Sequence, residues 1–369
     1  MSEHLYQVIY NDLLRKITTG EFAPNEKLPT EHELMSFYGV SRVTAITALN
    51  HLRDDGYITR SPRIGSVVRG AGTNGAPRGD IQFVTIWDND SIPGMYEAMR
   101  ERASDAGYGT VMYNSHHSVE AEREYLRSML SRRVAGVICY PLNGEFGNIS
   151  AFAQLRASGV PLITVDKRVW IPDGDIPCVT TDNRRAAYDM TSWLIEEMGH
   201  RRIAYCCARF DQANARYRFK GYVGALISHG IEYDPALTDE LESPSKPYRA
   251  HRSDFTEYLN YLMGLAEPPT AVVCECDYVA ISLMKSAKEL GVRVPERLSI
   301  VGFDNIDMSG MLEVPLTTME QDFTGIGAAA AERLLALMDG GKVEPLTLFG
   351  TKLIERASVR KLDNERIQG

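Results

Sequence analysis

Residues 1–69 carry hydrophobic positions at helical spacing in separate short runs. One apolar stripe consists of Leu5, Val8, Ile9, Leu13 and Ile17. Gly20 follows this stripe as a stop signal, which predicts a first helix. Thr30 and Glu33 have the Thr-x-x-Glu spacing of a capping box, so a short second helix is predicted from Thr30 to Tyr38.

A third amphipathic run and two strand-like runs follow. Ser41 is a suitable N-cap for a helix that ends at Gly56. Its apolar stripe consists of Ala45, Ala48, Leu49 and Leu52. Residues 57–68 read as two short strands around the turn Pro62–Gly65, a small hairpin. Three helices followed by a hairpin form an α+β winged helix-turn-helix, whose third helix is narrow enough to enter the major groove of DNA.

The rest of the chain alternates between short apolar runs and amphipathic runs. Strands are predicted at residues 81–87, 110–113, 134–140, 161–166, 178–181, 203–207, 271–274 and 299–303. Helices are predicted at residues 95–106, 119–131, 149–157, 184–198, 217–229, 254–264, 278–290 and 323–338. This alternation predicts an α/β body with parallel sheets covered by helices on both faces, and about 290 residues of it favour two lobes over one.

Polar side chains follow several of the predicted strands. Residues 87–91, 166–168 and 304–305 each come directly after a strand, and Tyr140 ends another. In open parallel sheets a ligand binds beyond the carboxyl ends of the strands, where such loops converge. A single Asp after a strand is usually a helix cap, but several polar groups at corresponding ends suit a hydroxyl-rich ligand.

A glycine-rich segment separates the two patterns. Residues 70–80 hold four glycines and one proline without a large apolar side chain, which is typical of a linker. Residues 1–69 contain 8 Lys+Arg and 8 Asp+Glu, so the other 300 residues, with 32 and 41, carry the whole net charge of -9. This acidic balance argues against coating of nucleic acid or membrane, although a local basic face stays open. We predict a winged helix-turn-helix at 1–69, a linker at 70–80 and an effector-binding and dimerisation domain at 81–360.

The residues around the third helix are similar to a known family. The run LPTEHELMSFYGVSRVTAITALNHLRDDGYITRSPRIGSVV resembles the DNA-binding domain of GntR-type bacterial regulators, and the match covers nearly all of residues 5–69. The resemblance implies DNA contacts from His32, Ser41, Arg42, Thr44, Thr47 and Arg63. Ile46 stands where the family usually has arginine, which removes a cationic contact, and Arg63 replaces the glycine of the wing tip, which adds one.

The body is similar to a second family. VPERLSIVGFDN, LTTMEQDF and ARYRFKGYVGAL resemble the effector domain of LacI/GalR-type regulators, which is itself similar to periplasmic sugar-binding proteins. The resemblance implies effector contacts at Asp166, Arg218, Asp304 and Gln321, with weaker support for Ser91, Lys167, Asn214 and Phe323. The forked donors of Arg218 suit vicinal hydroxyls or a carboxylate. Cys139 and Cys276 stand where the family often has asparagine, which leaves the identity of the sugar open.

A GntR-type head on a LacI/GalR-type body resembles the arabinose-type hybrid repressors of Gram-positive bacteria. This resemblance implies a homodimer that binds double-stranded, pseudo-palindromic operator DNA and is released by a pentose-like monosaccharide. Two alternatives stay open: corepression by a phosphorylated sugar or a nucleobase, and an adaptor without DNA affinity. A fusion of a winged helix to a pyridoxal-dependent enzyme would need a Schiff-base lysine in a Ser/Thr-rich strand-loop, and nothing in the chain fits that requirement well.

Other chemistries have little support in the residues. The sequence has no nucleophile elbow, Walker loop or His-x-x-x-His pair, so we predict no catalytic residue and no cofactor. Its 6 cysteines form no Cys-x-x-Cys pair and have no histidine cluster beside them, which favours buried reduced thiols over a metal site or disulfides. No apolar run approaches the roughly 18 residues of a membrane span. These features predict a cytoplasmic, nucleoid-associated protein with no membrane partner.

Overall fold

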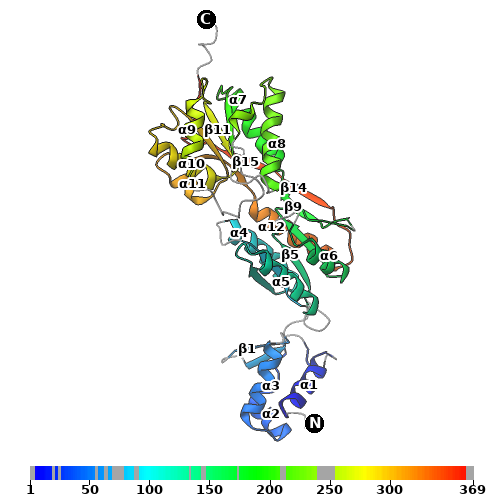
Figure 1. The fold of residues 1–369 in the computed structure, drawn as a ribbon. Coiled ribbons are helices and arrows are strands. Elements are labelled where there is room, and N and C mark those ends of the chain that lie inside the picture. The colour runs from blue at the N-terminus through cyan, green and yellow to red at the C-terminus, as the bar shows by residue number, and fades with distance from the viewer. Residues whose placement is uncertain are drawn as a thin grey trace. The chain divides into compact units, whose positions relative to one another are not determined.

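The computed structural model describes residues 5–18, 21–23, 26–54, 57–61, 65–68, 79–86, 91–132, 134–142, 147–172, 174–207, 213–238 and 254–362. The chain divides into two compact units, Met1–Asp80 with Gly107–Gly109, and the remaining residues 81–106 and 110–369 (Figure 1). We call residues 5–68 the head and the second unit the body. No helix in the described part of the chain is long and apolar enough to cross a membrane.

The head has three helices and a hairpin. The elements are α1 (Leu5–Thr18), α2 (Glu31–Tyr38), α3 (Arg42–Asp54), β1 (Ile58–Ser61) and β2 (Gly65–Val68), with β1 antiparallel to β2. The predicted capping box is present, because Glu33 N donates to Thr30 Oγ1 at 3.3 Å and Thr30 N donates to Glu33 Oε2 at 2.7 Å. Gly39 ends α2 with φ of 63°, a left-handed conformation that favours glycine. The winged helix-turn-helix prediction is therefore confirmed.

Lobe 1 of the body is built on a six-stranded, fully parallel sheet in the order β14-β9-β6-β5-β3-β4. Its strands are β3 (Ile81–Thr85), β4 (Thr110–Asn114), β5 (Gly136–Cys139), β6 (Leu162–Val165), β9 (Cys178–Thr181) and β14 (Leu346–Phe349). Its helices are α4 (Ser91–Asp105), α5 (Val119–Ser131), α6 (Ile149–Ala157) and α12 (Phe323–Met338). A small hairpin, β7 (Trp170–Ile171) with β8 (Gly174–Asp175), packs beside α6.

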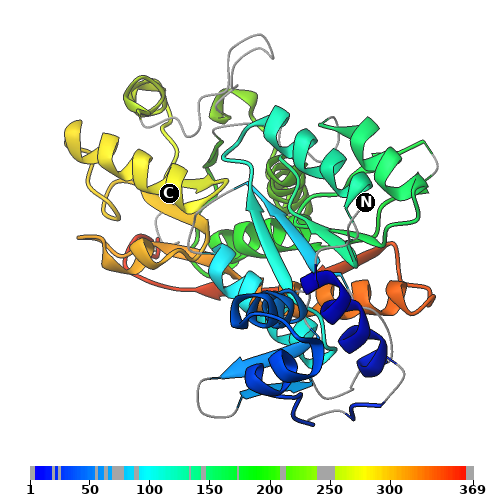
Figure 2. The same ribbon diagram turned by 90° about the horizontal axis from the view of Figure 1, so that it is seen from below.

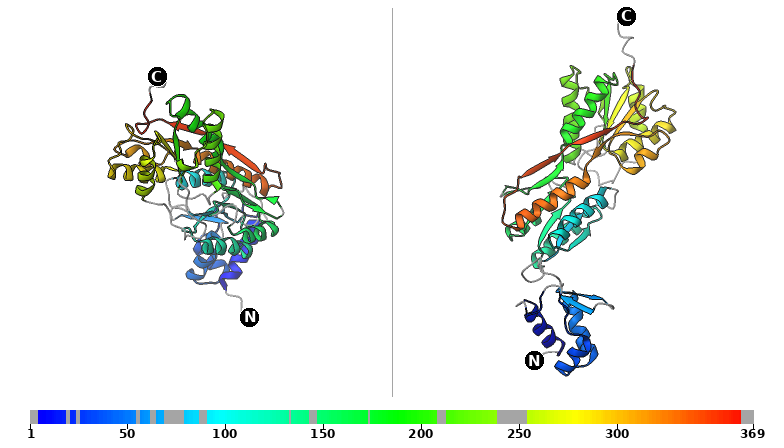
Figure 3. Two further views of the ribbon diagram at one scale, coloured as in Figure 1. Left: turned by 45° about the horizontal axis from the view of Figure 1, so that its top comes forward. Right: turned by 180° about the vertical axis from the view of Figure 1, so that it is seen from behind.

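Alternate residues of the lobe 1 strands face opposite layers of helices. Val84 joins the core beneath α5 and α6, whereas its neighbour Phe83 stacks on Tyr96 of α4. In Figure 2 the orange helix α12 lies on the opposite side of these strands from the green helix α6. Helices α4 and α12 run side by side (Figure 3, right), and a Cβ on Gly327 would lie 2.2 Å from the carbonyl oxygen of Met95, so only glycine permits this close approach.

Lobe 2 is built on a five-stranded sheet in the order β10-β11-β12-β13-β15, parallel except for β15. The strands are β10 (Ile203–Cys206), β11 (Ala271–Cys274), β12 (Ser299–Asp304), β13 (Thr317–Gln321) and β15 (Thr351–Ile354). The helices are α7 (Asn183–Glu196), α8 (Ala213–Ser228), α9 (Thr256–Gly264), α10 (Asp277–Glu289), the short α11 (Asp307–Met311) and the single turn η1 (Pro235–Leu237). Helices α7 and α8 cover one face, and α9 and α10 cover the other.

The chain crosses between the lobes three times. The crossings lie between β9 and α7, between β13 and α12, and between β14 and β15; the last is the red segment in Figure 3, right. These segments are joined to one another, because Asp182 N donates to Phe349 O at 2.8 Å and the Thr181 hydroxyl donates to Gln321 Oε1. The predicted two-lobed α/β body with parallel sheets is confirmed, and the crossings form its hinge.

Candidate functional site

The start of α3 brings most of the predicted DNA contacts of the head together. Ser41 caps the helix, since its Oγ accepts from Thr44 N at 3.3 Å and lies 2.9 Å from Thr44 Oγ1. Arg42 Nε donates to Glu31 Oε2 of α2 at 3.0 Å, and the arginine side chain remains 72% exposed. The hydroxyl of Thr47 donates to Val43 O at 2.8 Å.

The other predicted head residues are less fully defined. His32 is exposed in the first turn of α2, the helix that precedes α3. Arg63 lies outside the described residues. An exposed helix end that carries a guanidinium and short hydroxyls has the groups that contact phosphates and base edges.

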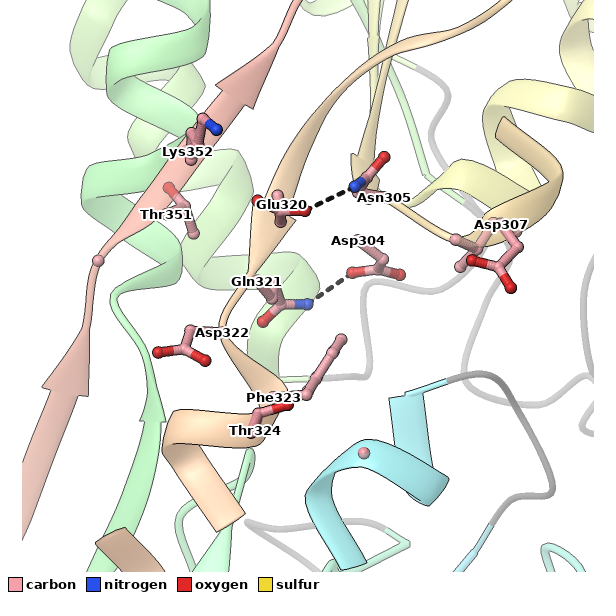
Figure 4. A pocket seen from close by; sticks show the side chains of 13 residues that line it. Asp304, Asn305, Asp307, Glu320, Gln321, Asp322, Phe323, Thr324, Thr351 and Lys352 are labelled. Atoms are coloured by element: carbon pink, nitrogen blue, oxygen red, sulfur yellow. Dashed lines mark hydrogen bonds between the residues drawn. The ribbon is translucent and has the colours of Figure 1, made fainter. Parts of the chain in front are cut away.

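The body contains a pocket of about 720 Å³ beside the hinge. It is lined by Asp304 and Asn305 after β12, by the segment 320–324 where β13 passes into α12, by 350–352, and by Gly94 of α4. Figure 4 shows Asp304, Gln321 and Phe323 around this space, with α4 of lobe 1 on the opposite side. Three predicted effector contacts therefore share one pocket, at the carboxyl ends of β12 and β13.

Arg218 of α8 is buried and fixed on several sides. Its Nε donates to Asn183 Oδ1 at 2.7 Å and its Nη1 donates to the carbonyl oxygen of Glu275 at 2.5 Å. Its Nη2 lies 3.4 Å from Asp304 Oδ1, and the guanidinium carbon is 3.6 Å from the centre of the Phe303 ring. These contacts hold the guanidinium in one orientation, so it can offer its remaining donors to a ligand without reorganising.

Asp304 is the second fixed group of lobe 2. Gln321 Nε2 donates to its Oδ1 at 2.6 Å. Burial raises the pKa of Asp304 to about 7, and the nearby Asp277 adds to the rise, while Arg218 opposes it. The backbone φ of Asp304 is 117°, a value that residues other than glycine rarely adopt. A ligand that donates hydrogen bonds to this carboxyl would stabilise its ionised form.

Asp166 is the corresponding group of lobe 1. It follows β6, has φ of 65°, and its Oδ2 accepts from Asn214 Nδ2 of α8 at 2.7 Å. Since α8 belongs to lobe 2, this hydrogen bond links the two lobes. Burial raises the pKa of Tyr140, and the nearby carboxyl groups of Asp166 and Asp304 add to the rise. Acceptors from both lobes therefore converge near Tyr140.

Lys167 and Ser91 are placed differently from these groups. The Lys167 ammonium is buried in lobe 1, where it donates to Leu142 O at 3.0 Å and lies 5.4 Å from the centre of the Tyr140 ring. Ser91 is the first residue of α4, and the structure does not describe its side chain. Both remain predictions as effector contacts.

Some residues that position the predicted effector contacts could not be identified from the sequence. Asn183 orients Arg218 and Thr181 contacts Gln321, but both sit in the run TTDNRR, which reads as a helix start. Glu275 acts through its carbonyl oxygen, for which a sequence offers no signal. Cys139, Cys178, Cys206, Cys207 and Cys274 are buried free thiols, and Cys276 is partly exposed. No group of metal-ligating side chains is present among the residues that are described.

Comparisons with known proteins match both units. Residues 5–68 match the family model of bacterial regulatory proteins, gntR family, and residues 194–359 match the periplasmic binding protein-like domain. The arabinose metabolism transcriptional repressor of Geobacillus stearothermophilus is 28% identical over 97% of this chain and 98% of its own length. The HTH-type transcriptional repressor CytR of Escherichia coli (strain K12) is 32% identical over 70% of this chain and 73% of its own length.

Solved structures agree on the fold of the body. The transcription regulator CcpA of Lactococcus lactis covers 77% of this chain and 100% of its own, with a TM-score of 0.65 and 24% identity. A likeness at this identity supports the architecture and not the ligand. The helix-turn-helix and the two-lobed body are thus each matched independently.

Proposed function

The chain belongs to the bacterial transcriptional repressors that join a gntR-type helix-turn-helix to a periplasmic-binding-protein-like body, and from this premise we propose that a monosaccharide controls it. The proposed state on DNA is a homodimer, associated through the body, whose two heads bind the halves of a pseudo-palindromic operator. Operator contacts come from His32, Ser41, Arg42, Thr44 and Thr47, together with Arg63. The proposal includes no catalytic step and no cofactor, and its site of action is the cytoplasm, at the nucleoid.

The observation that carries the effector proposal is the convergence of Asp166, Arg218 and Asp304 from two lobes. Carboxylates accept hydrogen bonds from hydroxyls, and the Arg218 guanidinium and the Gln321 amide donate them. Phe323 supplies an apolar ring for the C–H face of a sugar. Two carboxylates near one space disfavour a phosphorylated ligand, because like charges repel at short distance.

A pentose-like sugar is the proposed effector. The curated relative that matches this chain along nearly its whole length is named for arabinose metabolism. A sugar that contacts Asp166 in lobe 1 and Asp304 in lobe 2 binds the closed arrangement of the lobes better than the open one, so it shifts that equilibrium. The shift is proposed to lower operator affinity, which couples two distinct sites.

The test uses the full-length protein with pentoses, hexoses, sugar phosphates and nucleobases. A ligand at one hundred times its Kd stabilises the folded state by about 2.7 kcal/mol, which a thermal-shift screen detects. The hit is then added to the protein bound to an operator selected from random duplexes, and fluorescence anisotropy is recorded. We expect a neutral pentose to raise the Tm and to release the DNA.

Arg218→Ala should abolish both sugar responses and keep operator affinity. Arg185→Ala is the matched control, since Arg185 is an exposed arginine of α7 that pairs only locally with Asp189. Loss of DNA binding in Arg218→Ala would assign that residue to folding instead. A sugar phosphate or nucleobase hit would replace the proposed effector, and tighter operator binding with sugar would reverse the proposed direction of control.

A further inference from the structure

Two apolar side chains lie on the outward surface of α3. Val43 is 73% exposed, and Ile46, three residues later, is partly exposed. Positions three residues apart share one face of a helix. Among the described residues of the head, the hydrophobic core and the side chains packed against it include Ala45 and Leu49 but neither Val43 nor Ile46. These two side chains are therefore available to a partner.

The polar groups around them are already bonded within the head. The Ser41 and Thr44 hydroxyls lie 2.9 Å apart, and the Thr47 hydroxyl donates to the carbonyl oxygen of Val43. Arg42 is held by Glu31 of α2. The outward surface of α3 thus combines one guanidinium at its start with a patch of aliphatic side chains.

The major groove offers one apolar group that matches such a patch. Among the base edges it exposes, only thymine carries a methyl group, and contact with that methyl removes apolar surface of both partners from water. Residues three apart on a helix are separated by about 4.5 Å along its axis. This spacing lies between one and two base steps of a DNA strand, whose rise is about 3.4 Å per step.

We propose that Val43 and Ile46 bind the 5-methyl groups of two thymines in each operator half-site, one or two base steps apart. The inference rests on the proposed function, because it assumes that α3 enters the major groove. It assigns to these aliphatic side chains the selection of A·T pairs within the footprint of α3. Arg42 and the wing then supply contacts that do not discriminate in this way.

The test replaces thymine by uracil, which keeps base pairing and removes only the methyl group. Full-length protein is first used to select a duplex from a random pool. Each thymine of the selected site is then changed singly to uracil, and the Kd is measured at fixed salt. We expect roughly a three- to fivefold loss at two positions per half-site, the factor for burying one methyl group.

Variants connect each position to a side chain. In Val43→Ala, uracil should cost nothing at one of the sensitive positions, and in Ile46→Ala at the other. Val8→Ala is the matched control, because Val8 is 41% exposed on α1 and loses the same two methyl groups. Val43→Thr keeps the shape and one methyl group, so it should retain a reduced uracil penalty even if the alanine variant binds poorly.

The outcomes separate this inference from the proposed function. A selected duplex whose affinity is insensitive to uracil overturns the methyl contact and leaves the repressor in place. A uracil penalty that persists in both the Val43→Ala and Ile46→Ala variants also overturns it. Failure to select any duplex sequence contradicts the proposed function itself, and the inference with it.

Discussion

At the scale of single residues, the candidate effector site has strained backbone at Asp304 and Asn305, which line the pocket, and at Asp166 of lobe 1. Asp166, Asp304 and Asn305 all have positive φ, at 65°, 117° and 55°. Each such conformation costs on the order of 1 to 3 kcal/mol and persists only where the surroundings impose it. Asn305 is held from both sides, since its Nδ2 donates to Glu320 at 2.8 Å and its Oδ1 accepts from Arg356 at 2.7 Å. The carboxyl groups of Asp166 and Asp304 are thus placed before a ligand arrives.

The raised pKa of Asp304 predicts a pH-dependent stability. In the unfolded chain this carboxyl titrates near 3.9, and in the folded protein at about 7. Between these values the folded state binds more protons, so stability falls as the pH rises from 4 through 7. Asp304→Asn cannot ionise, so at pH 8 it should be more stable than the parent chain by on the order of 1 to 2 kcal/mol, reduced by partial exposure.

Thermal unfolding at two pH values checks this expectation. The Tm of Asp304→Asn should exceed that of the parent chain by a few degrees at pH 8 and should nearly equal it at pH 4. An equal offset at both values would show that proton uptake is not the cause. The same variant should lose its response to sugar, because the amide replaces an acceptor for hydroxyls.

Sequence patterns located Asp304 of the pocket and Asp166 of lobe 1 for a physical reason. Asp166 and Asp304 follow apolar strand runs, and the carboxyl ends of parallel strands converge. Asn183 could not be found in this way, because its role depends on α7 packing against α8. The run GVSR-x-T indicates DNA contacts only from its polar members, so it carries no signal for Val43. Its exposure became visible only in the folded head.

At the scale of elements, a capping box at the N-terminus of α2 stabilises this helix of the head. Thr30 accepts from Glu33 N while Glu33 accepts from Thr30 N, so two backbone donors at the start of α2 are satisfied. Loss of an N-cap hydroxyl typically costs about 1 kcal/mol. Thr30→Ala should therefore lower the stability of the head by about this amount.

Hydrogen exchange of the full-length protein measures that change directly. Amides of α2 and α3 should exchange roughly fivefold faster in Thr30→Ala, the factor that corresponds to about 1 kcal/mol. Ser36→Ala is the control, since Ser36 is exposed within the same helix and is not at its cap. Equal protection in the two variants would contradict a stabilising role for the capping box.

Predictability differed among the elements according to their burial. Helices 119–131, 149–157 and 323–338 agree with prediction at both ends. Side chains of Ser118 and Asp322 cap the first and the last of these helices. Strands β14 and β15 were not predicted. They lie at the edges of the two sheets, and their residues are mostly half-buried, so no continuous apolar run marks them. The chain passes directly from β14 in the sheet of lobe 1 into β15 in the sheet of lobe 2, where β15 runs antiparallel to β13. No local sequence pattern encodes this passage.

At the scale of the whole molecule, the hydrogen bond from Asn214 to Asp166 joins lobe 2 to lobe 1. Asn214→Asp would place a second carboxylate against Asp166, and repulsion should favour separation of the lobes. Since hydrogen bonds to charged groups contribute about 1.5 to 3 kcal/mol, we expect roughly a tenfold or greater loss of effector affinity.

Small-angle X-ray scattering of the full-length protein, together with calorimetric titration of the effector, checks this expectation. The radius of gyration should increase in Asn214→Asp and change less in Asn214→Ala, which removes the bond without adding a charge. Identical scattering and affinity in all three proteins would show that this bond does not influence lobe closure.

The two-lobed architecture was predictable from alternation, but the hinge was not. Strand and helix runs indicate parallel sheets wherever they alternate. Which strands share a sheet depends on long-range pairing, as for Thr181 with Phe349, and no local pattern specifies it. The threefold crossing therefore emerges only in the folded body.

The threefold crossing also sets an order of events during synthesis on the ribosome. The sheet of lobe 1 needs both β3, at residues 81–85, and β14, at 346–349, so it cannot be completed until nearly the entire polypeptide has emerged. The head, by contrast, draws its core from residues 9–68 alone. A nascent chain thus completes its DNA-binding head long before its body. Translation arrested in between would leave a folded head without the body through which, as proposed, two copies associate and an effector binds.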